Sequence, residues 1–442
     1  MPKPFQTALR PDVRPRELWA WAMYDFANSG YTTVVITALF NAYFVAVVAG
    51  NAPWATFAWT AALSASYLLI VLSAPLIGAY ADLRAAKKKL LALTTAGCVL
   101  FTALLYFAQP DTLWLAVVCV ILSNFFFGSG ENLIAAFLPE LSKARAMGRV
   151  SGWGWSLGYI GGLVSLGLCQ MYVTWAQAQG QTAEQFMPVT MLITAGIFAL
   201  ASIPTFLVLR ERTTPRMIES GITKVGTIEA ATIRMAWLRV WQTLRHLRQF
   251  ADLRRFLLCS LFYQAGIQAV ITLTAVYAHQ AMGFTIQQTL LLVLVVNITA
   301  ALGAFLFGHF QDRIGHVRSI ALTLAGWIAT ILLAWAAHEP TLFWVAANVA
   351  GLCLGASQSA GRALVGVLAP PSRAAEFFGL WGLAVKLASI AGPLTYGAAT
   401  WLTGGDHRQA LLVTGSYFIV GLILLFGVNA ARGRRAALRA ER

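Results

Sequence analysis

The sequence contains few charged residues for its length. Of its 442 residues only 11% are Asp, Glu, Lys or Arg and only 17 are acidic, whereas 58% are hydrophobic. The mean hydropathy of +0.68 lies far above that of water-soluble globular proteins. This scarcity of charge excludes a soluble domain and predicts an integral membrane protein.

The chain also lacks the motifs that carry enzymatic chemistry. It has no Gly-rich Walker loop, so direct use of ATP is not expected, and no spacing typical of a metal site or an activated nucleophile. Cysteines occur without paired spacing inside apolar stretches and are interpreted as packing residues: Cys98, Cys119, Cys169, Cys259 and Cys353. We therefore expect no cofactor and no enzymatic activity, which leaves movement of a solute.

Long apolar stretches are abundant, and twelve reach the roughly 20 residues that a membrane-spanning helix needs. They cover residues 18–48, 54–80, 89–108, 112–137, 151–175, 187–209, 255–279, 286–310, 317–337, 341–364, 377–401 and 409–430. The predicted fold class is therefore all-α and integral to the membrane. An even number of spans places both termini on the same side.

The net charge of +15 is concentrated in alternate loops, and the opposite set of loops contains only one base, Arg408. By the positive-inside rule, both termini and the central loop are expected to be cytoplasmic. This distribution favours the lipid bilayer, and not a nucleic acid, as the partner of the positive charge. We expect a multi-pass protein of the plasma membrane, which in a bacterium is the inner membrane.

The central loop divides the chain into two six-helix halves, 1–209 and 255–430, the second followed by a basic tail at 431–442. The loop itself, 210–254, has an apolar stripe opposite several arginines, which predicts an amphipathic helix on the cytoplasmic leaflet. The stripe is Ile233, Trp237, Val240, Trp241, Leu244 and Leu247, and the arginines are Arg234, Arg239, Arg245 and Arg248. A regulatory or nucleic-acid surface is the alternative, but the aromatic residues lie on the apolar face instead of among the bases.

A short motif occurs at matching places in the two halves. Its residues are Gly78, Asp82 and Arg84 in the first copy and Gly308, Asp312 and Arg313 in the second. Each copy joins two apolar stretches, which predicts a tight turn where Gly allows close approach and Asp caps the next helix or pairs with a base. The second copy ends on Gly315, whereas the first has Ala85 at the equivalent position. A tight turn is therefore less strongly predicted for the first copy. We interpret the motif residues, together with Arg362, as gating or conformational residues.

Lys386 is the most informative charge within the apolar stretches. It lies about nine residues into 377–401, or about 14 Å along a helix, which is near the bilayer midplane. An unpaired ammonium there costs about 2.5 to 3.5 kcal/mol even on a lenient insertion scale. Lys386 therefore needs an acidic partner, a water-filled cavity or loss of its charge. A structural ion pair and contact with a substrate or coupling ion both remain open.

Other polar residues form stripes on the predicted helices and face a cavity or a neighbouring helix. Asp25 either lines a cavity or pairs with a loop base. Glu131 is either a protonatable cavity residue or an interface residue opposite Arg149 or Lys143. The candidate binding or coupling residues are Asp25, Asn28, Asn124, Glu131, Gln268, Gln358 and Lys386.

The repeated motif resembles the Gly-x-x-x-Asp-Arg-x-Gly-Arg-Arg loop of the major facilitator superfamily. More specific segments resemble the bacterial "unknown major facilitator" family, which is related to the vacuolar amino-acid effluxers associated with autophagy. These segments are Tyr24 to Ser29, Phe137 to Leu141, Gly148 to Gly162, Gln358 to Arg362 and Phe377 to Pro393. The chain departs from its relatives at Ala265, where an acidic residue is common, and at Gly361-Arg362-Ala363, where Ser-Arg-Ser is common.

The resemblance implies the major facilitator fold and a monomeric secondary transporter of a small solute, with amino-acid efflux as one candidate. In this hypothesis two halves rock around a site near the midplane. Lys386 attracts a carboxylate or alternates between acidic partners, and Asp25 or Glu131 carries a coupling proton. The alternative is a flippase for a lipid or lipid-linked precursor, which would need a lateral opening and an apolar cavity wall.

Overall fold

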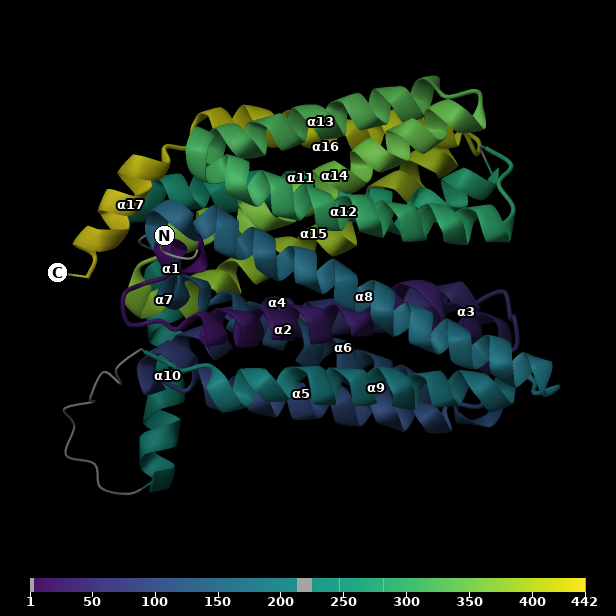
Figure 1. Cartoon of the computed structure of the whole chain (residues 1–442), viewed down its shortest axis with the longest axis horizontal. Helices are drawn as coiled ribbons and strands as arrows, with labels where there is room; N and C mark the ends of the chain where they lie inside the picture. Colours follow the sequence, from purple (N-terminus) through teal and green to yellow (C-terminus); the bar gives the residue numbers. More distant parts are fainter. Residues whose placement is uncertain (1–3, 213–224, 246, 281, 442) are drawn as a thin grey trace.

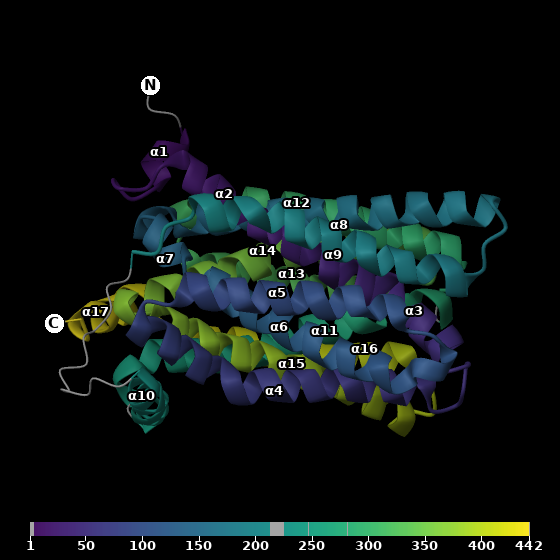
Figure 2. The same cartoon turned by 90° about the horizontal axis from the view of Figure 1, so that it is seen from below.

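The computed structural model describes residues 4–212, 225–245, 247–280 and 282–441 (Figure 1). Within these ranges, twelve helices are long and apolar enough to cross a membrane, as the sequence predicts. They run along a common axis in both views (Figures 1 and 2). The large apolar fraction therefore forms a bundle of long helices with lipid-facing side chains on its outside.

The spanning helices form two groups that follow the chain (Figure 1). The first group consists of α2 Pro15–Tyr31, α4 Ala55–Arg84, α5 Lys87–Leu104, α6 Leu113–Ala135, α8 Met147–Ala178 and α9 Ala183–Val208. The second group consists of α11 Ala251–Gln280, α12 Ile286–Ile314, α13 His316–Ala336, α14 Pro340–Leu368, α15 Ala374–Leu402 and α16 His407–Phe426. Contact between the groups runs chiefly through α4 with α15 and through α8 with α12 and α14.

One end of the bundle carries both chain termini and most of the short helices (Figure 1). The short helices there are α1 Pro4–Ala8, α7 Leu138–Leu141 and α17 Ala430–Arg439, and the longer linker helix α10 Val225–Arg245 lies at the same end. We call this the basic end, because the basic loops lie there. A single-turn helix, α3 Phe40–Tyr43, lies at the opposite end.

The first span is not a uniform helix. After α2 the chain continues through π-helical segments at Thr32–Ala38 and Phe44–Val48, although the sequence predicts one continuous helix over 18–48. A π-helical turn widens the helix and redirects the side chains beyond it, and such turns are frequent at functional sites. The polar stripe from Asp25 to Thr32 ends at the point where the first of these segments begins.

The turns after α4 and α12 show how the repeated motif is built. Both helices extend four residues beyond their predicted ends, so Asp82 and Asp312 lie in the last helical turn and not in the loop. Gly315 then adopts a φ of 94°, which a residue without Cβ reaches at low cost. Ala85 adopts a φ of 48° at the equivalent place, a left-handed conformation that a side chain disfavours.

The linker helix α10 runs across the bundle axis instead of along it (Figure 1). Ala236 and Val240 pack on Ala79 and Leu83 of α4. The stripe expected to face lipid is therefore divided: Val240 is buried against protein, whereas Trp237 and Trp241 are exposed. The side chains of Ile233, Leu244, Leu247 and Arg248 lie outside the described residues.

Candidate functional site

A buried ion pair joins the two groups at the middle depth of the bundle. The ammonium of Lys386 on α15 donates to Glu131 Oε2 on α6, with an Nζ–Oε2 distance of 3.2 Å. Lys386 is the thirteenth residue of its helix, or about 18 Å from the basic end at 1.5 Å per residue. The acidic partner of Lys386 is thus a residue that the sequence had singled out. The partners proposed for Glu131 were wrong, because Arg149 pairs with Asp312 and Lys143 donates to the carbonyl of Thr7.

The surroundings of this pair explain how a charge is tolerated there. The ammonium of Lys386 lies 5.7 Å from the ring centre of Tyr67 and 5.6 Å from that of Phe127, so two aromatic faces add electrostatic attraction. A Cβ at Gly128 would approach Lys386 Cε to 3.2 Å, so the glycine leaves room for the lysine chain. The side chain of Lys386 is 10% exposed and that of Glu131 is 28% exposed, so the carboxylate remains partly open to solvent.

Asn124 lies two helical turns from Glu131 on the same helix and is buried. Its amide donates to the hydroxyl of Ser66 on α4. This hydrogen bond keeps the polar face of α6 turned toward α4 and the interior.

A second buried ion pair links the groups closer to the basic end. Arg362 on α14 donates to Asp25 Oδ2 on α2 at 2.7 Å, and to the hydroxyl and carbonyl oxygens of Ser151 on α8 at 3.1 and 2.9 Å. Its guanidinium lies 4.7 Å from the ring centre of Trp21 and 5.3 Å from that of Trp155. Asp25 therefore pairs with a base inside the membrane region and not with a loop base.

Asn28 lies one turn beyond Asp25 and is also buried, and among the described residues its Oδ1 atom has no hydrogen-bond partner. A buried amide oxygen without a protein partner is costly unless water or a ligand satisfies it. Asn28 therefore remains a candidate contact for a bound molecule or a proton path.

Of the two glutamines predicted as binding or coupling residues, Gln358 pairs with another glutamine and Gln268 does not. Gln264 on α11 and Gln358 on α14 exchange two amide hydrogen bonds, of 3.0 and 3.3 Å. Gln268 is partly buried and forms no hydrogen bond within the described ranges. Gln264 was missed because Gln264 and Gln268 lie one turn apart on α11. Sequence spacing does not show which of the two faces α14.

The two motif aspartates cap helices of the opposite group, not the helices that follow them in sequence. Asp82 accepts hydrogen bonds from the amides of Ala375 at 3.2 Å and Glu376 at 2.9 Å, at the start of α15. Asp312 accepts from the amides of Gly148 at 2.9 Å and Arg149 at 3.2 Å, at the start of α8. Both carboxylates satisfy amides that the helix cannot pair itself and interact favourably with its dipole.

The motif glycines permit this contact between groups. A Cβ at Gly78 would clash with the backbone carbonyl of Ala375, and one at Gly308 would lie 2.8 Å from the carbonyl oxygen of Gly148. Both contacts join helix backbones directly, so a side chain at either glycine would separate the groups.

The bases of the motif divide into two kinds. Arg84 and Arg313, predicted as gating or conformational residues, are exposed, and their side chains form no ion pair or hydrogen bond within the described part of the chain. The buried base is Lys87, which pairs with Glu140 of α7 and lies 4.0 Å from Asp82. It was missed because a run of three lysines resembles a solvated loop.

A further ion-pair cluster ties the linker helix to the junction of the groups. Glu376, fully buried in the first turn of α15, accepts from Arg239 of α10 at 3.0 Å and from Arg373 at 2.8 Å. Because α10 also packs on α4, it bridges a helix of each group at the basic end.

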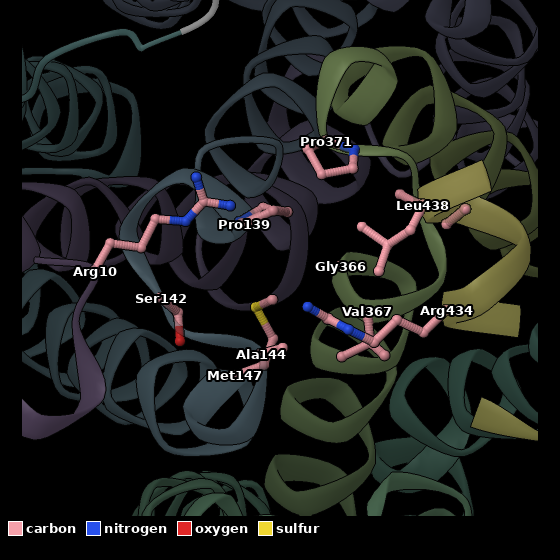
Figure 3. A pocket seen from close by; sticks show the side chains of 12 residues that line it. Arg10, Pro139, Ser142, Ala144, Met147, Gly366, Val367, Pro371, Arg434 and Leu438 are labelled. Atoms are coloured by element: carbon pink, nitrogen blue, oxygen red, sulfur yellow. The ribbon is translucent and has the colours of Figure 1, made fainter. Parts of the chain in front are cut away.

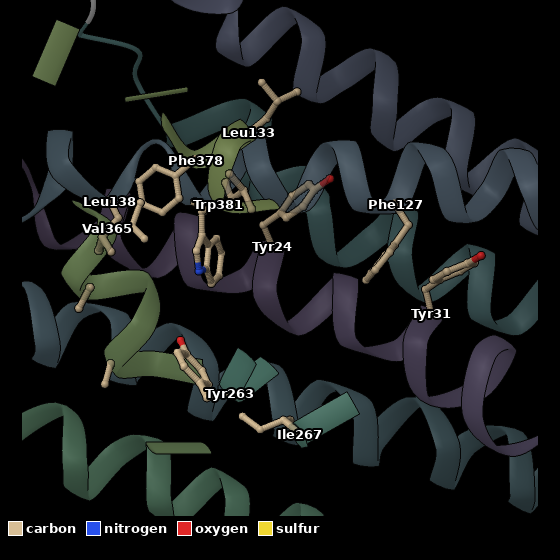
Figure 4. Close-up of a cluster of buried hydrophobic side chains, with 14 of the residues drawn as sticks. Tyr24, Tyr31, Phe127, Leu133, Leu138, Tyr263, Ile267, Val365, Phe378 and Trp381 are labelled. Carbon is tan, nitrogen blue, oxygen red and sulfur yellow. The ribbon is translucent and has the colours of Figure 1, made fainter. Parts of the chain in front are cut away.

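Apolar packing closes the same end of the interface. Buried side chains from both groups form one cluster that includes Tyr24, Leu138, Val365, Phe378 and Trp381 (Figure 4). Together with the caps, the glycine contacts and the ion pairs, these five side chains join the two groups toward the basic end.

Comparison with solved structures identifies the fold. The chain superposes on the proton:xylose symporter XylE with a TM-score of 0.70 at 14% identity, over 96% of this chain and 98% of that one. The human organic anion transporter MFSD10 gives a TM-score of 0.68 at 15% identity, over 93% and 99%. At this identity the likeness shows the fold alone, which is that of the major facilitator superfamily.

Sequence comparison then gives the family. The family model described as "Vacuole effluxer Atg22 like" matches residues 46–438, and the chain belongs to this family of transporters. An uncharacterized MFS-type transporter, YxiO of Bacillus subtilis (strain 168), is 26% identical over 418 residues, covering 92% of this chain and 93% of the relative. Autophagy-related protein 22-1 of Aspergillus fumigatus is 27% identical over 331 residues, which is 70% of this chain but only 54% of the fungal protein.

Proposed function

We propose that this chain is a secondary active transporter that moves a small solute bearing a carboxylate, with amino acids as the leading candidates and efflux as the direction. Membership of an effluxer family supports export, and the charged pair at middle depth supports recognition of a charged solute. By the positive-inside rule, the basic end would be cytoplasmic. The protein would be a monomer in the plasma membrane, which in a bacterium is the inner membrane.

The observation that carries the proposal is the Lys386–Glu131 pair. It joins the two groups, lies at the depth where alternating-access transporters bind solute, and rests on one hydrogen bond with a partly exposed carboxylate. A solute carboxylate that replaces Glu131 on the ammonium would free the glutamate to take a proton. Exchange of one anionic partner for another would thus couple solute movement to proton movement.

The cross-group contacts support the conformational half of the proposal. Asp82, Asp312 and Arg362 hold the basic end together through contacts that must all break before that end can open. Asp25 would be the second proton acceptor. Its protonation would remove the attraction between its carboxylate and Arg362 and so release one of these contacts. The alternating-access cycle would therefore consist of breaking and remaking these links.

The proposal is tested by uptake of a panel of labelled amino acids into proteoliposomes. A hydrogen bond to a charged group contributes about 1.5–3 kcal/mol, and Lys386→Met removes it from the solute site. Uptake of a transported amino acid should therefore fall by about 10- to 100-fold. The matched control is Lys89→Met, which removes the same charge from an exposed position on α5 and should leave uptake unchanged. Equal uptake by wild-type protein and the Lys386 variant would refute the carboxylate site.

A further inference from the structure

Among the residues that the structure describes, two arginines and no acidic residue line a small cavity at the basic end. Arg10 and Arg434 project into it from opposite sides (Figure 3). Within the described residues, neither guanidinium has an acidic partner within ion-pair distance. The pKa of Arg434 is lowered, first by burial and then by the positive charge of Arg10, so the two side chains repel each other. A bound anion would relieve this repulsion.

The two arginines are held in place by their backbones. The amide of Arg10 donates to the carbonyl of Leu141 at 3.0 Å, and Leu9 forms a bridge with Ser142. On the other side, Arg432 pairs with Asp252 at 2.6 Å and fixes α17 against α11. The chain segments that carry the two arginines are therefore fixed on either side of the cavity.

The cavity spans the boundary between the two groups of helices. Its walls include Met147 of α8 with the preceding Pro139 and Ser142 on one side, and Gly366 and Val367 of α14 with Leu438 of α17 on the other. Its volume of about 30 Å³ holds roughly two water-sized groups, and it opens to solvent. This space fits two oxygens of a phosphate group whose remainder stays outside.

We propose that this cavity is an anion-binding site that takes a phosphate group between Arg10 and Arg434 and thereby stabilises the joined state of the two groups at the basic end. Guanidinium is well suited to phosphate, because its planar array of donors matches two phosphate oxygens. The phosphate belongs either to a soluble anion or to a lipid headgroup. This site lies apart from Lys386 and Glu131 and does not depend on their role.

The test measures thermal unfolding of purified protein in detergent, in sodium phosphate and in sodium chloride of equal ionic strength. Phosphate should raise the Tm of wild-type protein by about 2 to 4 °C. Arg434→Gln should abolish this rise and, without phosphate, should have a Tm equal to or above that of wild type because the repulsion is gone. Arg10→Gln should behave in the same way, which provides a second variant if the first folds poorly.

The matched control is Arg435→Gln, which removes the same charge from the next, exposed residue of α17 and should keep the full rise. A parallel measurement in phosphatidylcholine nanodiscs with and without phosphatidic acid identifies the source of the phosphate group. Stabilisation by free phosphate assigns a soluble anion, and stabilisation by phosphatidic acid alone assigns a headgroup. A Tm unchanged by either, or a rise lost equally in the Arg435 variant, overturns the proposal.

Discussion

At the scale of single residues, the two buried ion pairs between the groups differ in how firmly they are held. Arg362 makes three hydrogen bonds and contacts two indole rings, and its side chain and that of Asp25 are 4% and 9% exposed. Lys386 makes one hydrogen bond to a carboxylate that is 28% exposed. The first pair is therefore suited to holding the groups together, and the second to exchanging partners.

Removal of one member of the tighter pair should be strongly destabilising. Arg362→Met leaves the Asp25 carboxylate buried without its partner, which costs about 3–5 kcal/mol in comparable pairs. The double variant Asp25→Leu/Arg362→Met removes both charges and should recover at least half of that loss. Chemical unfolding of four proteins in detergent, namely wild type, Asp25→Leu, Arg362→Met and the double variant, measures the coupling. Additive losses would show that the two side chains do not act as a pair.

Sequence alone predicts some of this site and misses the rest for a physical reason. Lys386 stood out because a lone ammonium in an apolar stretch requires compensation, and Glu131 stood out as an acid in another such stretch. Their pairing did not follow, because it depends on the relative depth and rotation of α6 and α15. Lys87 and Gln264 were missed for the same reason, since burial and partner are set by tertiary packing.

At the scale of elements, close helix packing at the basic end depends on glycine. Gly78→Ala places a methyl group against the backbone carbonyl of Ala375, which cannot move without shifting α15. We expect a loss of about 1–3 kcal/mol in unfolding free energy, as for overpacked sites. Gly196→Ala is the control, because no atom of the described residues outside its own helix backbone lies within 4 Å of its Cβ position, and alanine favours the helix by up to about 1 kcal/mol. Equal stability of the two variants in thermal unfolding would contradict the packing argument.

The linker helix should depend on Glu376 for its position. Glu376→Gln weakens the contacts with Arg239 and Arg373, each of which now bonds to a buried carboxylate. Amide hydrogen exchange within α10 should then accelerate by about tenfold, since charge-assisted hydrogen bonds are worth about 1.5–3 kcal/mol. Glu184→Gln, an exposed site on α9, should leave that exchange unchanged. Unaltered protection of α10 in the Glu376 variant would show that packing on α4 alone retains it.

The boundaries of the helices show what the length of an apolar stretch does and does not predict. The twelve spans were found at nearly the observed limits, because length and apolarity suffice to define a membrane helix. The last turns of α4 and α12 were assigned to loops because they are polar. Those turns are polar because Asp82 and Asp312 cap helices of the opposite group, a tertiary contact that the local sequence does not reveal.

At the scale of the whole molecule, the structure has its two groups of helices joined at the basic end by capped helix starts, glycine contacts and buried ion pairs. In our account, a transport cycle opens that end and closes the other around a solute held by Lys386. The fold is shared with the proton:xylose symporter XylE, and we propose that the arrangement of Lys386, Glu131, Asp25 and Arg362 determines which solute this chain moves.

The most direct test of the central claim is proton movement in liposomes that contain a pH-sensitive dye, with amino acids added outside. Wild-type protein should move protons when a transported amino acid is present. Glu131→Gln, which keeps the side-chain size but cannot take a proton, should abolish that flux. Solute-dependent proton flux that persists in the Glu131 variant would contradict the account. So would wild-type protein that moves no protons with any solute and instead redistributes labelled lipid.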